Sequence, residues 1–215
     1  MNKTQVIGKI RDTGIVPVIR ARSEDEARRL IEAIMAGGIS IFEVTMTVPN
    51  AVSLIRSLVT EFGDKAIIGA GTVLDASAAQ DCLAAAAKFV VSPVLDLSVI
   101  EVCRQAGTAV FPGALTPTEI FAAWRAGADA VKIFPANAMG GADYLKAIKA
   151  PFPQIELMPT GGVTLATIGG YIRAGAIAAG VGSDLADVHA IRSGETEKIT
   201  KTALAFINAV REARS

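Results

Sequence analysis

The sequence predicts an α/β fold, a single (β/α)8 TIM barrel with an extra N-terminal helix. Eight short apolar runs rich in β-branched residues recur along the 215 residues, about 20 to 27 positions apart. The segments between them show the period of an amphipathic helix, and four of these segments end in glycine just before the next run. Strands that alternate with helices run parallel and are covered on both faces, which explains the unbroken apolar runs.

The eight expected strands follow one another at regular intervals. In chain order they occupy residues 15–19, 39–44, 66–71, 88–93, 108–113, 129–135, 155–160 and 177–183. A doubly wound open sheet is the alternative fold, but its phosphate loop requires glycines directly after the first strand. The stretch 15–26 contains no glycine, so the barrel is the preferred prediction.

The segment 23–35 shows why we expect helices between the strands. Ser23 can cap its first turn, and three acidic residues follow at the end where the helix dipole is positive. One apolar stripe then runs along the segment and consists of Ala27, Leu30, Ile31 and Ile34.

Two further helices are expected at the ends of the chain. One precedes Ile15, and the other spans 195–214. The second has a broad apolar face made of Ile199, Leu204, Phe206, Ile207 and Val210. No linker-like or low-complexity segment separates the repeated units, so we expect one barrel domain over residues 1–215.

Charge and composition exclude several classes of protein. Lys and Arg number 21, as do Asp and Glu, and without a basic block we expect neither a nucleic-acid partner nor docking on an anionic membrane. No apolar run reaches the roughly 18 residues of a membrane span. The charged N-terminal segment does not resemble a signal peptide, so we expect a cytoplasmic protein in which Cys82 and Cys103 are reduced.

A single histidine, His189, restricts the possible chemistry. A His-rich metal site or a Ser–His–Asp triad would have to use this residue. It lies in a polar stretch, where we expect a position on a surface loop or helix. We therefore expect no metal site, and we expect no cofactor.

Two charged residues, Lys132 and Glu43, each lie between two apolar residues of an expected strand. Burying an ammonium group is costly, and a neutral amine attacks carbonyls to form a Schiff base. A carboxylate at a similar height can move the protons that this chemistry requires. The alternatives are a lysine that reaches solvent or a purely structural ion pair. For Glu156, whose surroundings are similar, we expect a structural role because strand alternation can place it on the outer face.

Small residues end the last two expected strands. Gly161 and Gly162 follow the seventh, and Gly182 and Ser183 close the eighth. Barrels often bind a phosphate between these two loops, so we expect a phosphate site there, although glycines also mark ordinary turns. Thr72 ends a similar glycine-containing turn after the third strand, where its hydroxyl could contact a carboxylate.

Six motifs occur in order along almost the whole chain. They are Glu43-Val44-Thr45, Gly69-Ala70-Gly71-Thr72-Val73, Ser92-Pro93, Phe111-Pro112-Gly113, Lys132-Ile133-Phe134-Pro135 and Pro159-Thr160-Gly161-Gly162. Together they resemble the class I 2-keto-3-deoxy-6-phosphogluconate (KDPG) aldolase family. That family includes the 4-hydroxy-2-oxoglutarate (KHG) aldolases and the 2-keto-3-deoxy-6-phosphogalactonate aldolases.

The resemblance implies a homotrimeric barrel, a lyase that cleaves a phosphorylated keto acid to pyruvate and glyceraldehyde 3-phosphate. It implies that Lys132 forms the Schiff base and that Glu43 transfers protons. Thr72 resembles a ligand of the pyruvyl carboxylate, and Phe134 resembles the aromatic residue beside it. The remaining implied positions are the pocket walls Pro93 and Pro112, and the phosphate cradle Gly161, Gly162, Gly182 and Ser183.

The chain departs from part of the family at Thr47. Some members carry an arginine shortly after the glutamate, and that arginine binds the substrate carboxylate. Other members place an arginine at the end of the first strand, as this chain does with Arg20. We therefore expect Arg20 to bind the carboxylate, since a guanidinium suits bidentate recognition.

Several alternatives remain open at the level of sequence. The preferred substrate can be KDPG, 2-keto-3-deoxy-6-phosphogalactonate or KHG. A phosphosugar isomerase or epimerase with Glu43 as base is a second possibility, weakened by the scarcity of metal-binding residues. A third is a catalytically silent barrel that serves as an oligomeric scaffold. Release of pyruvate distinguishes an aldolase from an isomerase or epimerase and from a silent scaffold.

Overall fold

Helices and strands alternate along the chain in the computed structural model, which describes residues 1–215. The strands are β1 (Ile15–Ile19), β2 (Ile41–Thr45), β3 (Ile67–Gly71), β4 (Phe89–Val91), β5 (Ala109–Phe111), β6 (Gly113–Ala114), β7 (Val131–Ile133), β8 (Leu157–Pro159) and β9 (Ala179–Val181). The α-helices are α1 (Lys3–Thr13), α2 (Glu24–Ala36), α3 (Ala51–Phe62), α4 (Ala76–Ala84), α5 (Leu97–Gln105), α6 (Pro117–Arg125), α7 (Ala142–Lys149), α8 (Ile168–Arg173), α9 (Val188–Arg192) and α10 (Thr196–Arg214). Short 3₁₀ turns occupy Gly63–Lys65 and Ala136–Met139.

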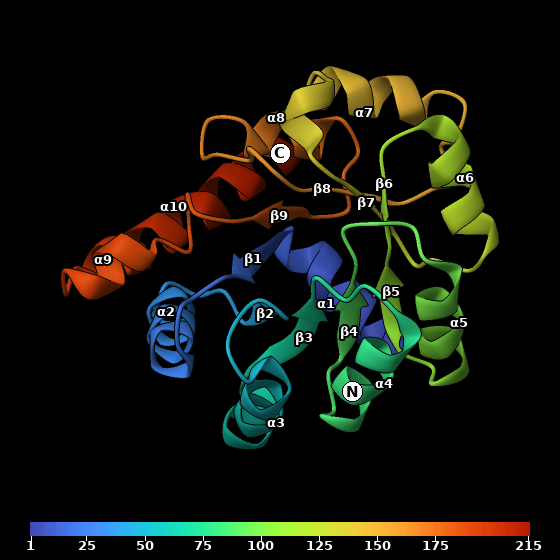
Figure 1. Ribbon diagram of the computed structural model, residues 1–215. Coiled ribbons are helices and arrows are strands. Elements are labelled where there is room, and N and C mark those ends of the chain that lie inside the picture. The colour runs from blue at the N-terminus through green and yellow to red at the C-terminus, as the bar shows by residue number, and fades with distance from the viewer.

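All paired strands are parallel. One sheet has six strands in the order β5-β4-β3-β2-β1-β9, and a second has three in the order β6-β7-β8. Two isolated parallel bridges, Leu157 with Ala176 and Thr160 with Gly180, lie between the β8 and β9 regions. The strands occupy the centre of the molecule and curl, while the helices lie around them (Figure 1). The architecture is therefore α/β, with a curved parallel sheet.

The expected strand 108–113 is observed as two pieces, β5 and β6, separated by Pro112. Proline has no N–H group to donate to a strand ladder, so the regular pairing stops at this residue. Its carbonyl still accepts a hydrogen bond of 2.8 Å from the backbone N–H of Lys132. The interruption therefore places Pro112 directly beside the lysine.

Two groups of buried apolar side chains form the core. The larger contains 55 residues and lies between the strands and the surrounding helices. The smaller contains 13 residues and includes Val6 and Ile10 of α1. These pack with Val16, Ile41 and Ile67, which lie at or next to the first residues of β1, β2 and β3. Helix α1 thus covers the amino ends of the strands and leaves their carboxyl ends for the polar groups.

The local signals in the first helix after β1 are confirmed. Ser23 caps α2 by accepting a hydrogen bond of 3.2 Å from the backbone N–H of Glu26. The expected apolar stripe is buried, and its members are Ala27, Leu30, Ile31 and Ile34.

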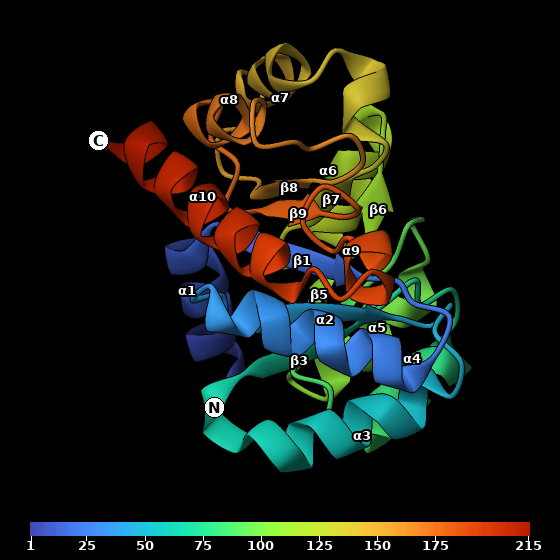
Figure 2. The ribbon, with the colours of Figure 1, turned by 90° about the vertical axis from the view of Figure 1, so that its left-hand side faces the viewer.

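The last helix, α10, packs against α2 and α8, and Figure 2 shows it crossing this side of the molecule. Its buried residues are Ile199, Ala203, Phe206 and Val210, spaced by three or four positions. The expected inclusion of Leu204 in the core face is wrong, because this side chain is 52% exposed. Leu204 is one position out of phase with the buried stripe.

Both cysteines are free and buried. Burial raises the pKa of Cys82 to about 11 and that of Cys103 to about 12. The thiolate, which is the reactive form, is therefore strongly disfavoured at neutral pH.

No helix combines the length and the apolar character that crossing a membrane requires.

Candidate active site

Lys132 and Glu43 lie together inside the curved sheet. Their side chains are 2% and 0% exposed, and the lysine Nζ lies 3.6 Å from Oε1 of the glutamate. No protein group donates a hydrogen bond to either carboxylate oxygen of Glu43. The two groups lie just beyond hydrogen-bond distance of each other, so a small molecule beside them can contact both the amine and the carboxylate.

One glycine of β3, Gly71, makes room for this carboxylate, and a second, Gly69, makes room for a neighbouring ring. In the register between β2 and β3, Glu43 faces Gly69 and Thr45 faces Gly71. A Cβ atom on Gly71 would lie 2.1 Å from Oε1 of Glu43, and a Cβ on Gly69 would lie 2.5 Å from the ring of Phe89. A side chain at Gly71 would thus displace the glutamate.

Thr72 directly follows Gly71 and has a left-handed backbone, with φ of 59°. This conformation is strained for a β-branched residue, and such strain is concentrated at functional sites. Thr72 therefore lies next to the glycine that contacts Glu43. Its backbone conformation is imposed by the surrounding structure, because a threonine does not favour it by itself.

A cavity of about 320 Å³ opens at the carboxyl ends of β1, β7, β8 and β9. It brings together six of the residues singled out in the sequence, which are Arg20, Phe134, Gly161, Gly162, Gly182 and Ser183. Lys132 and Glu43 do not line it but lie beside it, because the lysine Nζ is 5.4 Å from the ring centroid of Phe134. A ligand in this cavity can therefore have one end near the amine and the other near the glycines.

Thr72, Pro93 and Pro112 do not line the 320 Å³ cavity. Pro112 is nevertheless bonded through its carbonyl to the backbone of Lys132. Pro93 packs against the same region, because a Cβ atom on Gly113 would lie 2.3 Å from its carbonyl carbon. The two prolines thus lie beside the strand that carries Lys132 and outside the 320 Å³ cavity.

Glycine is required at both positions of the loop after β8. Gly161 and Gly162 have φ of 90° and 68°, in the left-handed region. A Cβ on Gly162 would also lie 2.4 Å from the side chain of Asn137. The backbone of this loop can therefore approach a ligand closely, as an anion-binding loop must.

Two polar residues of the cavity, Thr160 and Asp184, have no role expected from the sequence. Thr160 is 6% exposed, and its Oγ1 has no hydrogen-bond partner in the protein. Asp184 directly follows Ser183 and adds a carboxylate to the same wall. Their only sequence signal is position, since Thr160 belongs to the Pro159-Thr160-Gly161-Gly162 motif and Asp184 follows the glycine-containing end of the eighth expected strand.

The ends of β1 and β2 are joined beside Arg20. The hydroxyl of Thr45 donates a hydrogen bond of 3.0 Å to the carbonyl of Ile19. The oxygens of Thr45 and Thr47 are 2.7 Å apart, so Thr47 is the donor in this pair. Thr47, where part of the family carries arginine, therefore supports the strand end from which Arg20 projects.

Other expectations concern residues outside the cavity. His189 is exposed on α9, which confirms its expected surface position. Glu156 pairs with Arg11 at 2.9 Å and with Lys149 at 4.0 Å, away from Lys132, which confirms its structural role. No group of three or more His, Cys, Asp or Glu side chains is placed to hold a metal ion.

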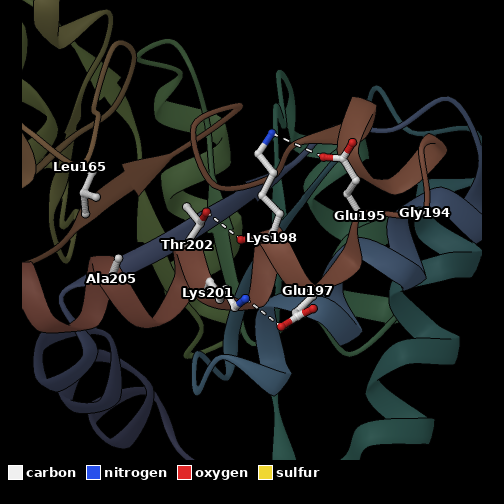
Figure 3. A pocket seen from close by; sticks show the side chains of 8 residues that line it. All are labelled: Leu165, Gly194, Glu195, Glu197, Lys198, Lys201, Thr202 and Ala205. Atoms are coloured by element: carbon white, nitrogen blue, oxygen red, sulfur yellow. Dashed lines mark hydrogen bonds and ion pairs between the residues drawn. The ribbon is translucent and has the colours of Figure 1, made fainter.

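A second hollow, of about 590 Å³, lies at the start of α10 (Figure 3). Its charged side chains form ion pairs with one another, Lys201 with Glu197 at 2.8 Å and Lys198 with Glu195 at 3.9 Å. All four side chains are more than half exposed. This hollow therefore has no buried charged group that could bind or activate a substrate.

Comparison with known proteins agrees with this geometry. The family model described as "KDPG and KHG aldolase" matches residues 6–202. The chain is 38% identical over 206 residues to the 2-dehydro-3-deoxy-6-phosphogalactonate aldolase of Escherichia coli K12, which covers 93% of this chain and 95% of the relative.

Solved structures show the same similarity. The crystal structure of a KDPG aldolase from Legionella pneumophila, with pyruvate captured as a covalent carbinolamine, superposes with a TM-score of 0.86 at 32% identity, covering 93% of this chain and 96% of that one. A cube-shaped cage designed by fusing symmetric oligomeric domains gives a TM-score of 0.84 at 35% identity, covering 94% of this chain and 73% of that one.

Proposed function

The chain belongs to the KDPG and KHG aldolase family, and from this premise we propose how its residues cleave KDPG, or a close analogue, to pyruvate and glyceraldehyde 3-phosphate. The protein is a lyase of the class I aldolase type. One observation carries the assignment of roles, namely the contact of 3.6 Å between Lys132 and Glu43, both of which are shielded from solvent.

The first half of the reaction builds an electron sink on the lysine. The Nζ of Lys132 attacks the C2 ketone of the substrate and forms a carbinolamine. Loss of water then gives an iminium ion. Glu43 takes the proton of the C4 hydroxyl, the C3–C4 bond breaks, and its electron pair moves through C3 to the iminium nitrogen. Glyceraldehyde 3-phosphate leaves, and an enamine of pyruvate remains on Lys132.

The second half restores the enzyme. Glu43 returns its proton to C3 of the enamine, which becomes the iminium of pyruvate. Water adds to C2, pyruvate leaves, and the free amine of Lys132 is restored. Because the carboxylate ends in its starting form, one glutamate serves both proton transfers.

Two groups of residues hold the ends of the substrate. Arg20 binds the pyruvyl carboxylate, with Thr72 and Phe134 beside it, and Pro93 and Pro112 support the surroundings of the lysine. Gly161, Gly162, Gly182 and Ser183 hold the phosphate with backbone N–H groups. That Arg20 and these four residues line one cavity supports the assignment. Replacement of Arg20 with alanine should weaken pyruvate binding, and an unchanged affinity for pyruvate would refute its role.

Reduction with borohydride in the presence of pyruvate tests the mechanism directly. The wild-type protein should gain one reduced pyruvyl group on Lys132, detectable by mass spectrometry of the peptide. Lys132→Ala should gain none, and Lys201→Ala, which alters an exposed lysine of α10, should react as the wild type does. An adduct on Lys132→Ala, or none on the wild type, would show that the mechanism is wrong.

The galactonate-derived substrate is the second candidate. The similarity to a 2-dehydro-3-deoxy-6-phosphogalactonate aldolase favours it. Pyruvate release from KDPG, its galactonate epimer and unphosphorylated KHG should be compared as kcat/KM. The phosphorylated substrates should exceed KHG, because only they use the phosphate cradle.

We also propose that the strands close into one eight-stranded barrel within a single domain, with α1 as its extra helix. The bridges between β8 and β9 and the adjacency of β5 and β6 support this closure.

A homotrimer is supported by the likeness to a symmetric oligomeric domain, and light scattering tests it. A cytoplasmic location suits a charged phosphorylated substrate, which crosses membranes poorly.

A further inference from the structure

Glu26 joins the start of α2, together with the loop just before it, to α9, which lies far away in the chain. Its Oε1 accepts a hydrogen bond of 2.7 Å from Nε of Arg192 on α9, and its Oε2 accepts one of 3.1 Å from Nη2 of the same arginine. The same Oε2 accepts a bond of 2.9 Å from the backbone N–H of Arg22, in the loop before α2. Arg22, Glu26 and Arg192 are called the Glu26 cluster below.

Each arm of the cluster leads to one wall of the 320 Å³ cavity. Arg22 is two residues after Arg20, which lines the cavity where β1 ends. Arg192 is one helical turn after Val188, which lines the same cavity together with Ser183. The cluster therefore connects the segment that carries the guanidinium to the segment that carries the phosphate cradle.

A second bond reinforces the connection between α2 and α9. Nη2 of Arg29 donates a hydrogen bond of 2.9 Å to the carbonyl of Ile191. On the cavity side of α9, the N–H groups of Leu185 and Ala186 both bond to the carbonyl of Gly182, at 3.0 and 2.8 Å. The wall from Gly182 to Arg192 is thus compact, and it is held to α2 from outside the cavity.

We propose that Glu26 is a positioning residue, which sets the separation between the Arg20 loop and the phosphate cradle by holding Arg22 and Arg192 on one carboxylate. The inference rests on the proposed function, because it concerns the two ends of the same phosphorylated keto acid. When the spacing is rigid, both ends of the substrate can bind at once. When one wall of the cavity is mobile, the enzyme binds the part of the substrate that contacts this wall more weakly.

The two arms make the proposal testable, because each can be released separately. Arg192→Ala releases only the wall that carries the cradle. It should raise the dissociation constant of inorganic phosphate and the KM of phosphorylated substrate roughly threefold to tenfold, within the range of one partly exposed bidentate pair. The pyruvate concentration that gives half of the maximal adduct in borohydride trapping should not change. Glu26→Ala releases both arms and should weaken phosphate and pyruvate together, with kcat nearly constant.

The matched control is another bidentate pair, Arg104 with Glu101 on α5, at 2.9 Å for both bonds. Arg104→Ala removes the same chemistry far from the cavity and should change neither phosphate nor pyruvate binding. If Arg192→Ala folds poorly, Arg192→Lys keeps the charge, loses the bidentate geometry and should give a smaller loss of phosphate affinity.

Equal phosphate affinity in the wild type, Arg192→Ala and Arg192→Lys would overturn the proposal. A loss of phosphate affinity in Arg104→Ala as large as that in Arg192→Ala would also overturn it. Failure of the proposed function is a separate result, because the wild type would then release no pyruvate from any of the three substrates. Phosphate binding by isothermal titration does not depend on turnover and would still report on the Glu26 cluster.

Discussion

Nζ of Lys132 and Oε1 of Glu43 lie 3.6 Å apart although their strands, β7 and β2, belong to different sheets. The contact therefore spans the interior between the two sheets and exists only because they curve toward each other. Both side chains are shielded from solvent, at 2% and 0% exposure. Under the proposed mechanism, changes at Glu43 and at its neighbours should therefore act on catalysis.

Glu43→Gln should abolish most of the activity while the chain still folds. An amide cannot accept and return the proton, so kcat should fall about 10²- to 10⁴-fold, the usual worth of a general base. The measurement is steady-state pyruvate release. Glu156→Gln is the control, since that carboxylate pairs with Arg11 of α1, the helix that covers the amino ends of the strands, and its loss should leave kcat unchanged. Similar kcat values for the two variants would contradict the role of Glu43.

Gly71→Ala should lower activity by displacing Glu43. The new methyl group would lie 2.1 Å from Oε1, 2.4 Å from Cγ and 2.5 Å from Cδ of Glu43, so the whole buried side chain has to move. A displacement of about 1 Å at a catalytic group can cost roughly a hundredfold in rate. We expect kcat to fall by about this factor. Thermal unfolding of the same variant shows whether it is folded.

Gly8→Ala is the matched control for this substitution. Gly8 lies inside α1, and a Cβ atom there would meet no heavy atom within 4 Å. Alanine at this site should stabilise the protein by about 0.5–1 kcal/mol and leave kcat unchanged. A decrease in kcat for Gly8→Ala equal to that for Gly71→Ala would show that the effect is not local.

The carboxyl of Glu26 predicts a pH dependence of stability. The hydrogen bond from Arg192, and then that from the backbone of Arg22, lower the pKa of Glu26 from 4.5 to about 2 in the folded protein. Because the unfolded chain binds this proton more tightly, the stabilisation is complete above pH 4.5 and is lost as the pH falls toward 2. The difference in unfolding free energy between the wild type and Glu26→Gln should shrink over this interval. A difference that stays constant from pH 5 to pH 2.5, in steps of about half a pH unit, would contradict the ion pair.

Helix α10 offers a test of the corrected apolar face. Phe206 is fully buried, whereas Leu204 is 52% exposed. Phe206→Ala should cost about 3–5 kcal/mol through lost burial and a cavity, and Leu204→Ala should change stability by less than about 0.5 kcal/mol. Denaturant unfolding measures both changes in the free energy of unfolding, provided that the m-values of the variants equal that of the wild type. Equal costs would return Leu204 to the core face.

Much of the fold could be predicted because its signals are local. The cap at Ser23 and the stripe that includes Leu30 depend on residues within a few turns of one another, and both are observed. The break at Pro112 was missed because the apolar pattern of 108–113 continues through the proline. The error at Leu204 has a similar origin, since a broad apolar face does not reveal which residues a neighbouring helix covers.

The candidate site was only partly predictable. Lys132 and Glu43 were identifiable because charge is rare in buried strands, and the glycines because motifs place them at strand ends. Thr160 lies in a recognised motif and Asp184 follows Ser183, but neither had a signal for a role of its own, since a threonine or an aspartate beside a glycine turn is common on any surface. Only the cavity shows that both residues face the same space.

By itself the sequence determined the alternation of strands and helices, the two charges inside the strands and the glycine loops, because each of these arises from neighbours in the chain. The tertiary structure alone decided that Lys132 meets Glu43, that Gly71 leaves room for the carboxylate, and that Glu26 connects two cavity walls. The physical reason is that such contacts depend on the curvature of the sheet and on the register of distant segments, which no local pattern encodes.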